Sequence, residues 1–126
     1  MKKTLIFMIF LVSILAGCNN GDKYINLSGE SDHWKGEYVA TATEDTENGT
    51  YKFKYKNANS DSDVTFKKLQ VLIDDATEQN ETNHEGPIIE IPTACSGCSV
   101  TNESIPKNVT IKWDGNTETF SLKKSK

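Results

Sequence analysis

Arginine is absent from this 126-residue sequence, and all 14 basic residues are lysines. The chain therefore lacks the guanidinium group, which binds carboxylates and phosphates through two parallel hydrogen bonds. Acidic residues number 18, so the formal net charge is −4. An acidic chain has no basic field to attract phosphates, and we expect no nucleic-acid partner.

Long apolar runs are also scarce, and the one that occurs lies at residues 4–16. At about 13 residues it is shorter than the about 20 that a membrane-spanning helix needs. Lys2 and Lys3 precede the run, and Leu15-Ala16-Gly17-Cys18 follows it. A positive start followed by a short apolar helix and small residues is typical of a secretory signal peptide.

The order of these segments resembles that of bacterial prolipoproteins, in which a lipobox ends in the cysteine that is lipidated. The resemblance implies a signal peptide at residues 1–17, a diacylglycerol group on Cys18 and a short tether at 18–23. Two acyl chains hold a protein firmly on a bilayer, whereas one anchors it only marginally. We therefore expect the protein on the extracytoplasmic face of a cell membrane, anchored by the lipid on Cys18.

Cysteine is rare, and with Cys18 lipidated only Cys95 and Cys98 remain. The motif Cys95-Ser96-Gly97-Cys98 has four interpretations: a structural disulfide, two inert thiols, a thioredoxin-like redox pair, or a metal site completed by histidines. The disulfide is favoured because exported proteins keep disulfides. The flanking residues look like strand and loop, whereas a redox pair usually begins a helix. His33 and His84 are too scattered for common zinc spacings, so we predict no metal and no cofactor.

Apolar and polar residues alternate along much of the chain, which predicts β-strands with one buried face. The clearest case is residues 51–55, where Tyr51, Phe53 and Tyr55 alternate with lysines. Other expected strands lie at 24–27, 34–43, 64–74, 88–91, 108–113 and 117–122. About seven short strands predict an all-β domain over residues 24–126, a small antiparallel β-sandwich of immunoglobulin-like size that follows an N-terminal signal helix.

The connections between these strands carry their own signals. Asn48-Gly49 predicts a hairpin turn, and the polar run at 75–86 predicts a long loop. The alternation slips near Lys67-Lys68, which indicates a β-bulge. Trp34 and Trp113 fit the alternation, so we interpret them as core residues in preference to an exposed aromatic platform.

Three further segments resemble a group of small uncharacterised Bacillus-type lipoproteins. They are residues 29–35 (GESDHWK), residues 93–98 (TACSGC) and residues 109–115 (VTIKWDG). The resemblance implies a lipid-anchored all-β domain, and it transfers no activity and no catalytic residue.

No serine, cysteine or carboxylate in the sequence has an evident base or partner nearby, so we predict no catalytic residues. The leading hypothesis is a non-catalytic binding domain that recognises another protein, such as another envelope protein, or an envelope component. The alternative is an envelope thiol-redox protein that uses Cys95 and Cys98. A third interpretation is a carrier of a small molecule or metal ion beside a transporter.

Overall fold

The computed structural model describes residues 22–57 and 64–125, which form one antiparallel β-sheet. Its strands are β1 (Lys23–Glu30), β2 (Trp34–Ala42), β3 (Thr46–Tyr55), β4 (Thr65–Ile73), β5 (Ala76–Glu85), β6 (Ile88–Ser96), β7 (Lys107–Trp113) and β8 (Asn116–Lys124). In these two ranges no helix has the length and apolar character needed to cross a membrane. The predicted signal peptide, Cys18 and most of the tether lie outside the described residues.

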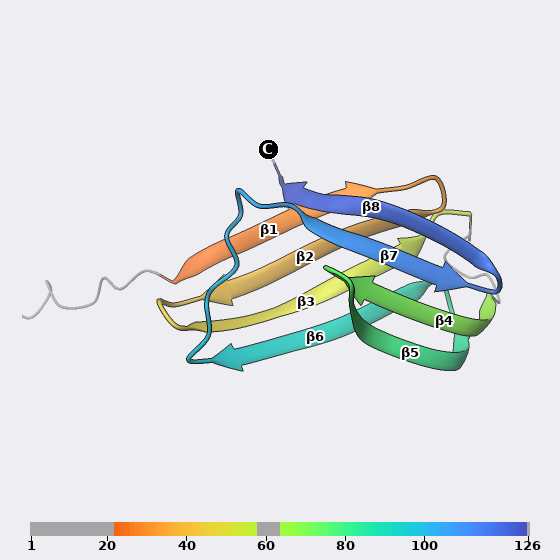
Figure 1. Ribbon diagram of the computed structural model, residues 1–126, viewed down its shortest axis with the longest axis horizontal. Coiled ribbons are helices and arrows are strands. Elements are labelled where there is room, and N and C mark those ends of the chain that lie inside the picture. The colour runs from red at the N-terminus through yellow and green to blue at the C-terminus, as the bar shows by residue number, and fades with distance from the viewer. Residues whose placement is uncertain (1–21, 58–63, 126) are drawn as a thin grey trace, which may run out of the picture.

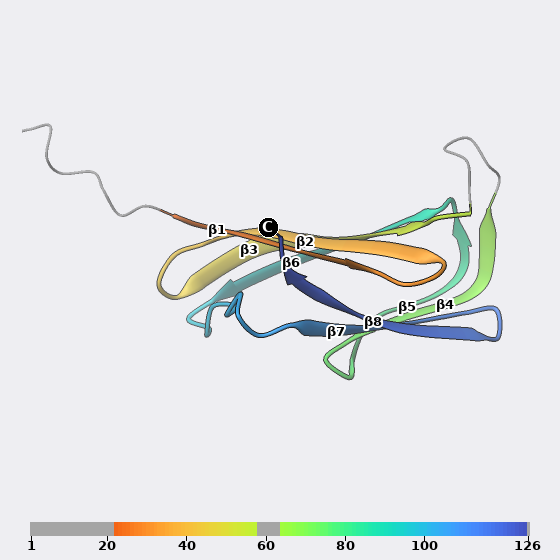
Figure 2. The same cartoon turned by 90° about the horizontal axis from the view of Figure 1, so that it is seen from above.

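The sheet folds over on itself in the strand order β5-β4-β7-β8-β1-β2-β3-β6. Strands β1, β2, β3 and β6 form one layer, and β4, β5, β7 and β8 form the other (Figures 1 and 2). The layers are joined where β1 pairs with β8, at Leu27↔Lys124 and Ser28↔Lys123. The other side stays open between β5 and β6, which are the two edges of the sheet.

The all-β prediction is confirmed, but the finer architecture differs from a seven-stranded sandwich. The described residues contain eight strands, and hydrogen bonding between β1 and β8 makes them one continuous sheet. The sheet is nearly a barrel. Gly29 permits the close approach of β8 to β1, because a Cβ there would lie 2.0 Å from the carbonyl oxygen of Ser121.

The core lies between the layers and follows the period-two alternation of the strands. Trp34 and Trp113 are 0% and 6% exposed, so their interpretation as core residues is confirmed. The other buried side chains of the core are Ile25, Leu27, Tyr38, Ala40, Ala42, Tyr51, Phe53, Phe66, Leu69, Val71, Ile73, Ile89, Ile91, Val109, Ile111, Phe120 and Leu122.

The expected loop at residues 75–86 is instead the ten-residue strand β5, paired with β4. Glu81 lies opposite the buried Leu69, so it belongs to the inward-facing row of β5. That row also holds Gln79 and His84, which are half-buried and polar. The strand therefore lacks the apolar alternation by which the other strands can be predicted.

The expected hairpin turn at Asn48-Gly49 lies inside β3. Thr43 N donates to Thr46 O at 2.9 Å, so the chain reverses between β2 and β3 before that dipeptide. A Cβ at Gly49 would come within 2.9 Å of Tyr38 Cε1 and 2.6 Å of Ala40 Cβ. Glycine at this position therefore serves close strand packing, and its turn propensity is unused.

The slip in alternation near Lys67-Lys68 is confirmed by burial. Phe66 and Leu69 are both buried, and the two exposed lysines lie between them. The register shift against β5 lies further along, between Val71 and Leu72.

Candidate functional site

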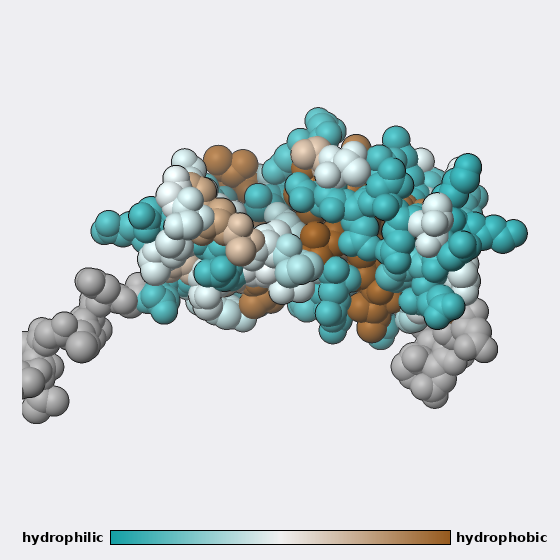
Figure 3. Space-filling model, turned by 90° about the horizontal axis from the view of Figure 1, so that it is seen from below, coloured by the Kyte–Doolittle hydropathy of each residue, from teal (hydrophilic) through white to brown (hydrophobic). Residues whose placement is uncertain are grey.

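The open side of the sheet contains a hollow of about 150 Å³. Glu78 of β5 lines it on one side, and Thr93, Ala94 and Cys95 of β6 line it on the other. Tyr38, Glu47 and Tyr51 complete the lining from β2 and β3. Seen from this side, hydrophobic atoms are visible among hydrophilic side chains (Figure 3).

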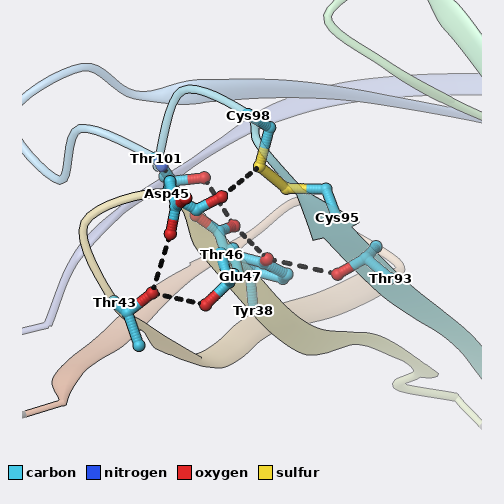
Figure 4. Close-up of a disulfide and its surroundings, with 9 residues drawn as sticks. All are labelled: Tyr38, Thr43, Asp45, Thr46, Glu47, Thr93, Cys95, Cys98 and Thr101. Carbon is cyan, nitrogen blue, oxygen red and sulfur yellow. Dashed lines mark hydrogen bonds between the residues drawn. A yellow bond between two sulfur atoms is a disulfide. The ribbon is translucent and has the colours of Figure 1, made fainter.

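Glu47 is a buried carboxylate beside this hollow, with 7% of its surface exposed. It accepts a short hydrogen bond from the Tyr38 hydroxyl. The backbone N–H and the hydroxyl of Thr101 donate to its two oxygens at 2.7 and 2.8 Å. The hydroxyl oxygen of Tyr38 also lies 3.2 Å from Thr93 Oγ1 (Figure 4). A buried charge is tolerated when its oxygens are hydrogen-bonded in this way.

The ionisation of this cluster follows from those contacts. Burial opposes the charge on Glu47, but the hydrogen bonds from Tyr38 and Thr101 outweigh it and hold the pKa of Glu47 below its usual value. Burial, followed by the hydrogen bond to Glu47, raises the pKa of Tyr38 to about 12. Burial also raises the pKa of Tyr51, and the nearby Asp74 and Glu78 add to that rise. The lining of the hollow therefore combines two carboxylates, Glu47 and Glu78, with the rings of Tyr38 and Tyr51.

Cys95 and Cys98 are joined by a disulfide with a Cα–Cα distance of 6.0 Å. Cys95 lies near the end of β6, opposite Glu47 of β3. Gly97 adopts a φ of +71° in the reversal between the cysteines. Cys98 N donates to Asp45 O at 3.1 Å, and Cys98 Sγ lies 3.9 Å from the same oxygen (Figure 4). The reversal is therefore fixed to the turn between β2 and β3.

The segment after the disulfide covers the same end of the sheet. Val100 packs against the core, and Thr101 supplies the two donors to Glu47. A second hollow, of about 840 Å³, lies beside this segment. Its lining consists of Asp22, Lys23, Ala42, Thr43, Glu44, Asp45, Val100, Thr101 and Asn102. This larger hollow is therefore at the end of the domain where β1 begins.

The two histidines are each paired with a glutamate. His33 Nδ1 contacts Glu118, which also accepts from His33 N at 2.9 Å and from Ser31 Oγ at 2.6 Å. Burial opposes the charge on Glu118, yet the hydrogen bonds from Ser31 and His33 lower its pKa. His84 Nδ1 lies 2.9 Å from Glu81 Oε2, and this contact lowers the pKa of Glu81.

The structure does not bring the histidines and cysteines together. The ring centroid of His33 lies 6.1 Å from that of Tyr55, and the ring centroid of His84 lies 6.3 Å from that of Phe66. Both histidines are therefore at the end of the sheet where β2 begins. Within the described ranges, no group of three or more His, Cys, Asp or Glu side chains has an arrangement that could hold a metal ion.

Sequence reasoning missed Glu47, Tyr38, Thr93 and Thr101 as a cluster. One signal was available, because Glu47 is an even number of residues from the inward-facing Tyr51 in β3 and so belongs to the same face of the strand. Thr93 likewise continues the inward-facing row of Ile89 and Ile91 in β6. Nothing in the local sequence indicates Thr101, which reaches Glu47 across 54 positions.

Comparison of the chain with protein-family models, with characterised proteins and with solved structures found no match.

Proposed function

We propose that this protein is a lipid-anchored, non-catalytic binding protein on the extracytoplasmic face of a cell membrane. The observation that carries the proposal is the order of segments at residues 1–18, which ends in Leu15-Ala16-Gly17-Cys18. Lys23, the first residue of β1, follows Cys18 by five residues. Five extended residues span at most about 18 Å, so the anchored domain would stand next to the bilayer.

The arrangement of the polar residues supports binding over catalysis. Glu47 accepts three hydrogen bonds from Tyr38 and Thr101, and Glu118 accepts hydrogen bonds from Ser31 Oγ and His33 N, so few lone pairs of either carboxylate remain free. A general base needs a free lone pair within reach of a substrate proton. These carboxylates instead hold loops against strands. The partner that we propose is another protein of the envelope, met through the open side of the sheet.

The anchor is tested by metabolic labelling with palmitate in a bacterium that processes lipoproteins. The full chain should incorporate label and enter the detergent phase on phase separation. Cys18→Ala should lose both properties and retain its leader. Cys95→Ser is the matched control, and it should be labelled as the parent is. Label that persists in Cys18→Ala would show that acylation lies elsewhere.

The thiol-redox alternative is favoured by one observation, the exposure of Cys95 at the end of an edge strand. In that reaction the Cys95–Cys98 disulfide would accept two electrons and two protons from a dithiol of the partner. The pair would become two thiols, and the partner dithiol would become a disulfide. Differential alkylation across a glutathione redox series measures this directly. A pair that exchanges readily supports the alternative, and a pair that resists reduction is structural.

A further inference from the structure

The two edges of the sheet differ in how they are protected against further pairing. An edge strand exposes unpaired backbone N–H and C=O groups, and proteins commonly block it with lysine, proline or short length. β6 carries Pro92 at its centre. β5 is ten residues long and contains neither lysine nor proline. Within the described residues β5 pairs only with β4, so its other edge has no strand partner.

The register of β5 against β4 shifts between Gln79 and Thr77, and Asn83 has a φ of +55°, so the regular part of this edge is residues 79–82. Near the C-terminal end of β5, His84 Nε2 lies 2.9 Å from Ile88 O of β6, so the open part of the edge precedes His84.

The charged side chains of β5 are nearly all of one sign. Glu78, Glu81 and Glu85 are acidic, and His84 is the single basic residue of the strand. Glu81 is engaged with His84 and with Gln79 Nε2 at 2.6 Å. Glu78 and Glu85 are exposed and make no ion pair within the described part of the chain. The lysines of β4 lie one strand spacing further from the open edge.

These charges decide what can pair with β5. Two copies of the chain meeting edge to edge would oppose one acidic strand to another, and like charges on paired strands are destabilising. A basic strand has the opposite charge and meets no such repulsion. The hollow beside Glu78, with Tyr38 and Tyr51 in its lining, would receive apolar side chains on the inward face of an added strand. The pattern that fits is therefore an extended segment in which basic and apolar residues alternate.

We propose that the open edge of β5 binds an extended basic segment of a partner protein, which adds to the sheet as a further strand beside the hollow of about 150 Å³. In such strand addition main-chain hydrogen bonds supply affinity, and alternate side chains supply specificity. This inference rests on the proposed binding function and names its site and its partner class.

The probe is a labelled ten-residue peptide of alternating lysine and valine, titrated against the full chain in detergent micelles. Binding by fluorescence anisotropy is expected, together with protection of β5 amides from hydrogen exchange. A second peptide with glutamate in place of lysine should bind at least tenfold more weakly. If the lysine peptide fails to bind, the proposal is wrong.

N-methylated peptides separate strand pairing from charge attraction alone. A strand that adds to an edge uses the N–H groups of alternate residues. Methylating one alternate set of peptide nitrogens should therefore weaken binding at least tenfold, while methylating the other set should leave it within about threefold. Equal binding of the two methylated peptides would overturn the proposal, because non-specific attraction makes no such distinction.

The acidic residues are tested by the double variant Glu78→Lys with Glu85→Lys. It should lose at least tenfold in affinity for the lysine peptide and gain affinity for the glutamate peptide. Asp32→Lys with Glu44→Lys changes net charge equally, in the exposed turns on either side of β2 in the other layer, and should bind as the parent does. An equal loss in both double variants would overturn the assignment to this edge. Cys18→Ala should bind the peptide normally, so failure of the anchor and failure of the edge are distinguishable.

Discussion

The inner faces of β2 and β3 are aromatic at one end and small and polar at the other. Trp34 pairs in register with Tyr55, whereas Ala42 pairs with Glu47. At the first end the ring centroid of Trp34 lies 5.2 Å from that of Tyr55, 5.4 Å from that of Phe66 and 5.6 Å from that of Trp113. At the second end hydrogen bonds to Glu47 and the Cys95–Cys98 disulfide are added to the stacking of Tyr38 on Tyr51, whose ring centroids are 4.2 Å apart.

The difference shows two ways of closing one sheet. Aromatic side chains bury large areas without needing partners of matched geometry. The polar end instead depends on every donor being in place, because an unsatisfied buried carboxylate is costly. We expect the aromatic end to supply more of the stability, and the polar end to be more sensitive to pH and to redox conditions.

The largest effect should come from the aromatic end. Trp34→Ala is expected to lower the free energy of unfolding by about 3–5 kcal/mol, because it leaves a cavity among the rings of Tyr55, Phe66 and Trp113. Urea denaturation followed by circular dichroism measures the loss. Trp34→Phe should cost less, since the buried Trp34 Nε1 has no hydrogen-bond partner among the described residues. A loss below about 1 kcal/mol for Trp34→Ala would contradict the ranking of the two ends.

The second-largest effect should be a loss of stability at the polar end at alkaline pH. Tyr38 has a folded-state pKa raised to about 12 from an ordinary value of 10.0, so its stabilisation is complete below pH 10 and is lost as pH rises through about 12. A shift of this size corresponds to at most about 3 kcal/mol. The stability gap between the parent and Tyr38→Phe, measured by urea titration at several pH values, should shrink over this interval. A constant gap would contradict the assignment.

Glu47→Gln should cost about 2 kcal/mol near neutral pH, because it removes a charged acceptor from Tyr38 and Thr101. Since the pKa of Glu47 is lowered from 4.5, its contribution is present above that value and is lost as pH falls through the folded-state pKa. The difference in free energy of unfolding between Glu47→Gln and the parent, measured with urea, should therefore disappear at acidic pH. Glu44→Gln, in an exposed turn, serves as the control and should change little.

The smallest effect should follow loss of the disulfide. Cys95→Ser with Cys98→Ser is expected to cost about 2 kcal/mol or less, because the bridge closes a ring of only about four residues. The same urea titration with and without reductant measures it, and the double variant should be insensitive to reductant. A cost comparable to that of Trp34→Ala would mean that the bridge also holds Thr101 on Glu47.

The alternation of apolar residues predicted most of the fold. Strands such as β2 and the second half of β3 have one buried face, so apolar residues recur at every second position of their sequence. β5 could not be predicted in this way, because its inward row of Gln79, Glu81 and His84 faces the open rim of the sheet. A polar rim strand and a polar loop have the same composition.

The candidate site was less predictable for a related reason. Cys95 and Cys98 stand out because of their spacing, but Glu47 and Thr101 gain meaning only from contacts between distant segments. The dipeptide Asn48-Gly49 led to a wrong prediction of a hairpin turn, because glycine is used both in turns and where strands pack closely. Its missing Cβ, which favours turns, here leaves room for Ala40 Cβ and the Tyr38 ring of the neighbouring strand.

The pairing of β1 with β8 has a consequence for the order in which the domain can fold. β1 is the first strand of the described chain and β8 the last, and Ser125 N donates to Asn26 O at 3.1 Å across 99 positions. β1 can pair with its sequence neighbour β2 early in folding, but its other side pairs only with β8, the last strand of the described chain. The two layers therefore become hydrogen-bonded to each other only after β8 is available to pair with β1. A chain shortened by a few residues at its end would keep both layers and lose their hydrogen-bonded link.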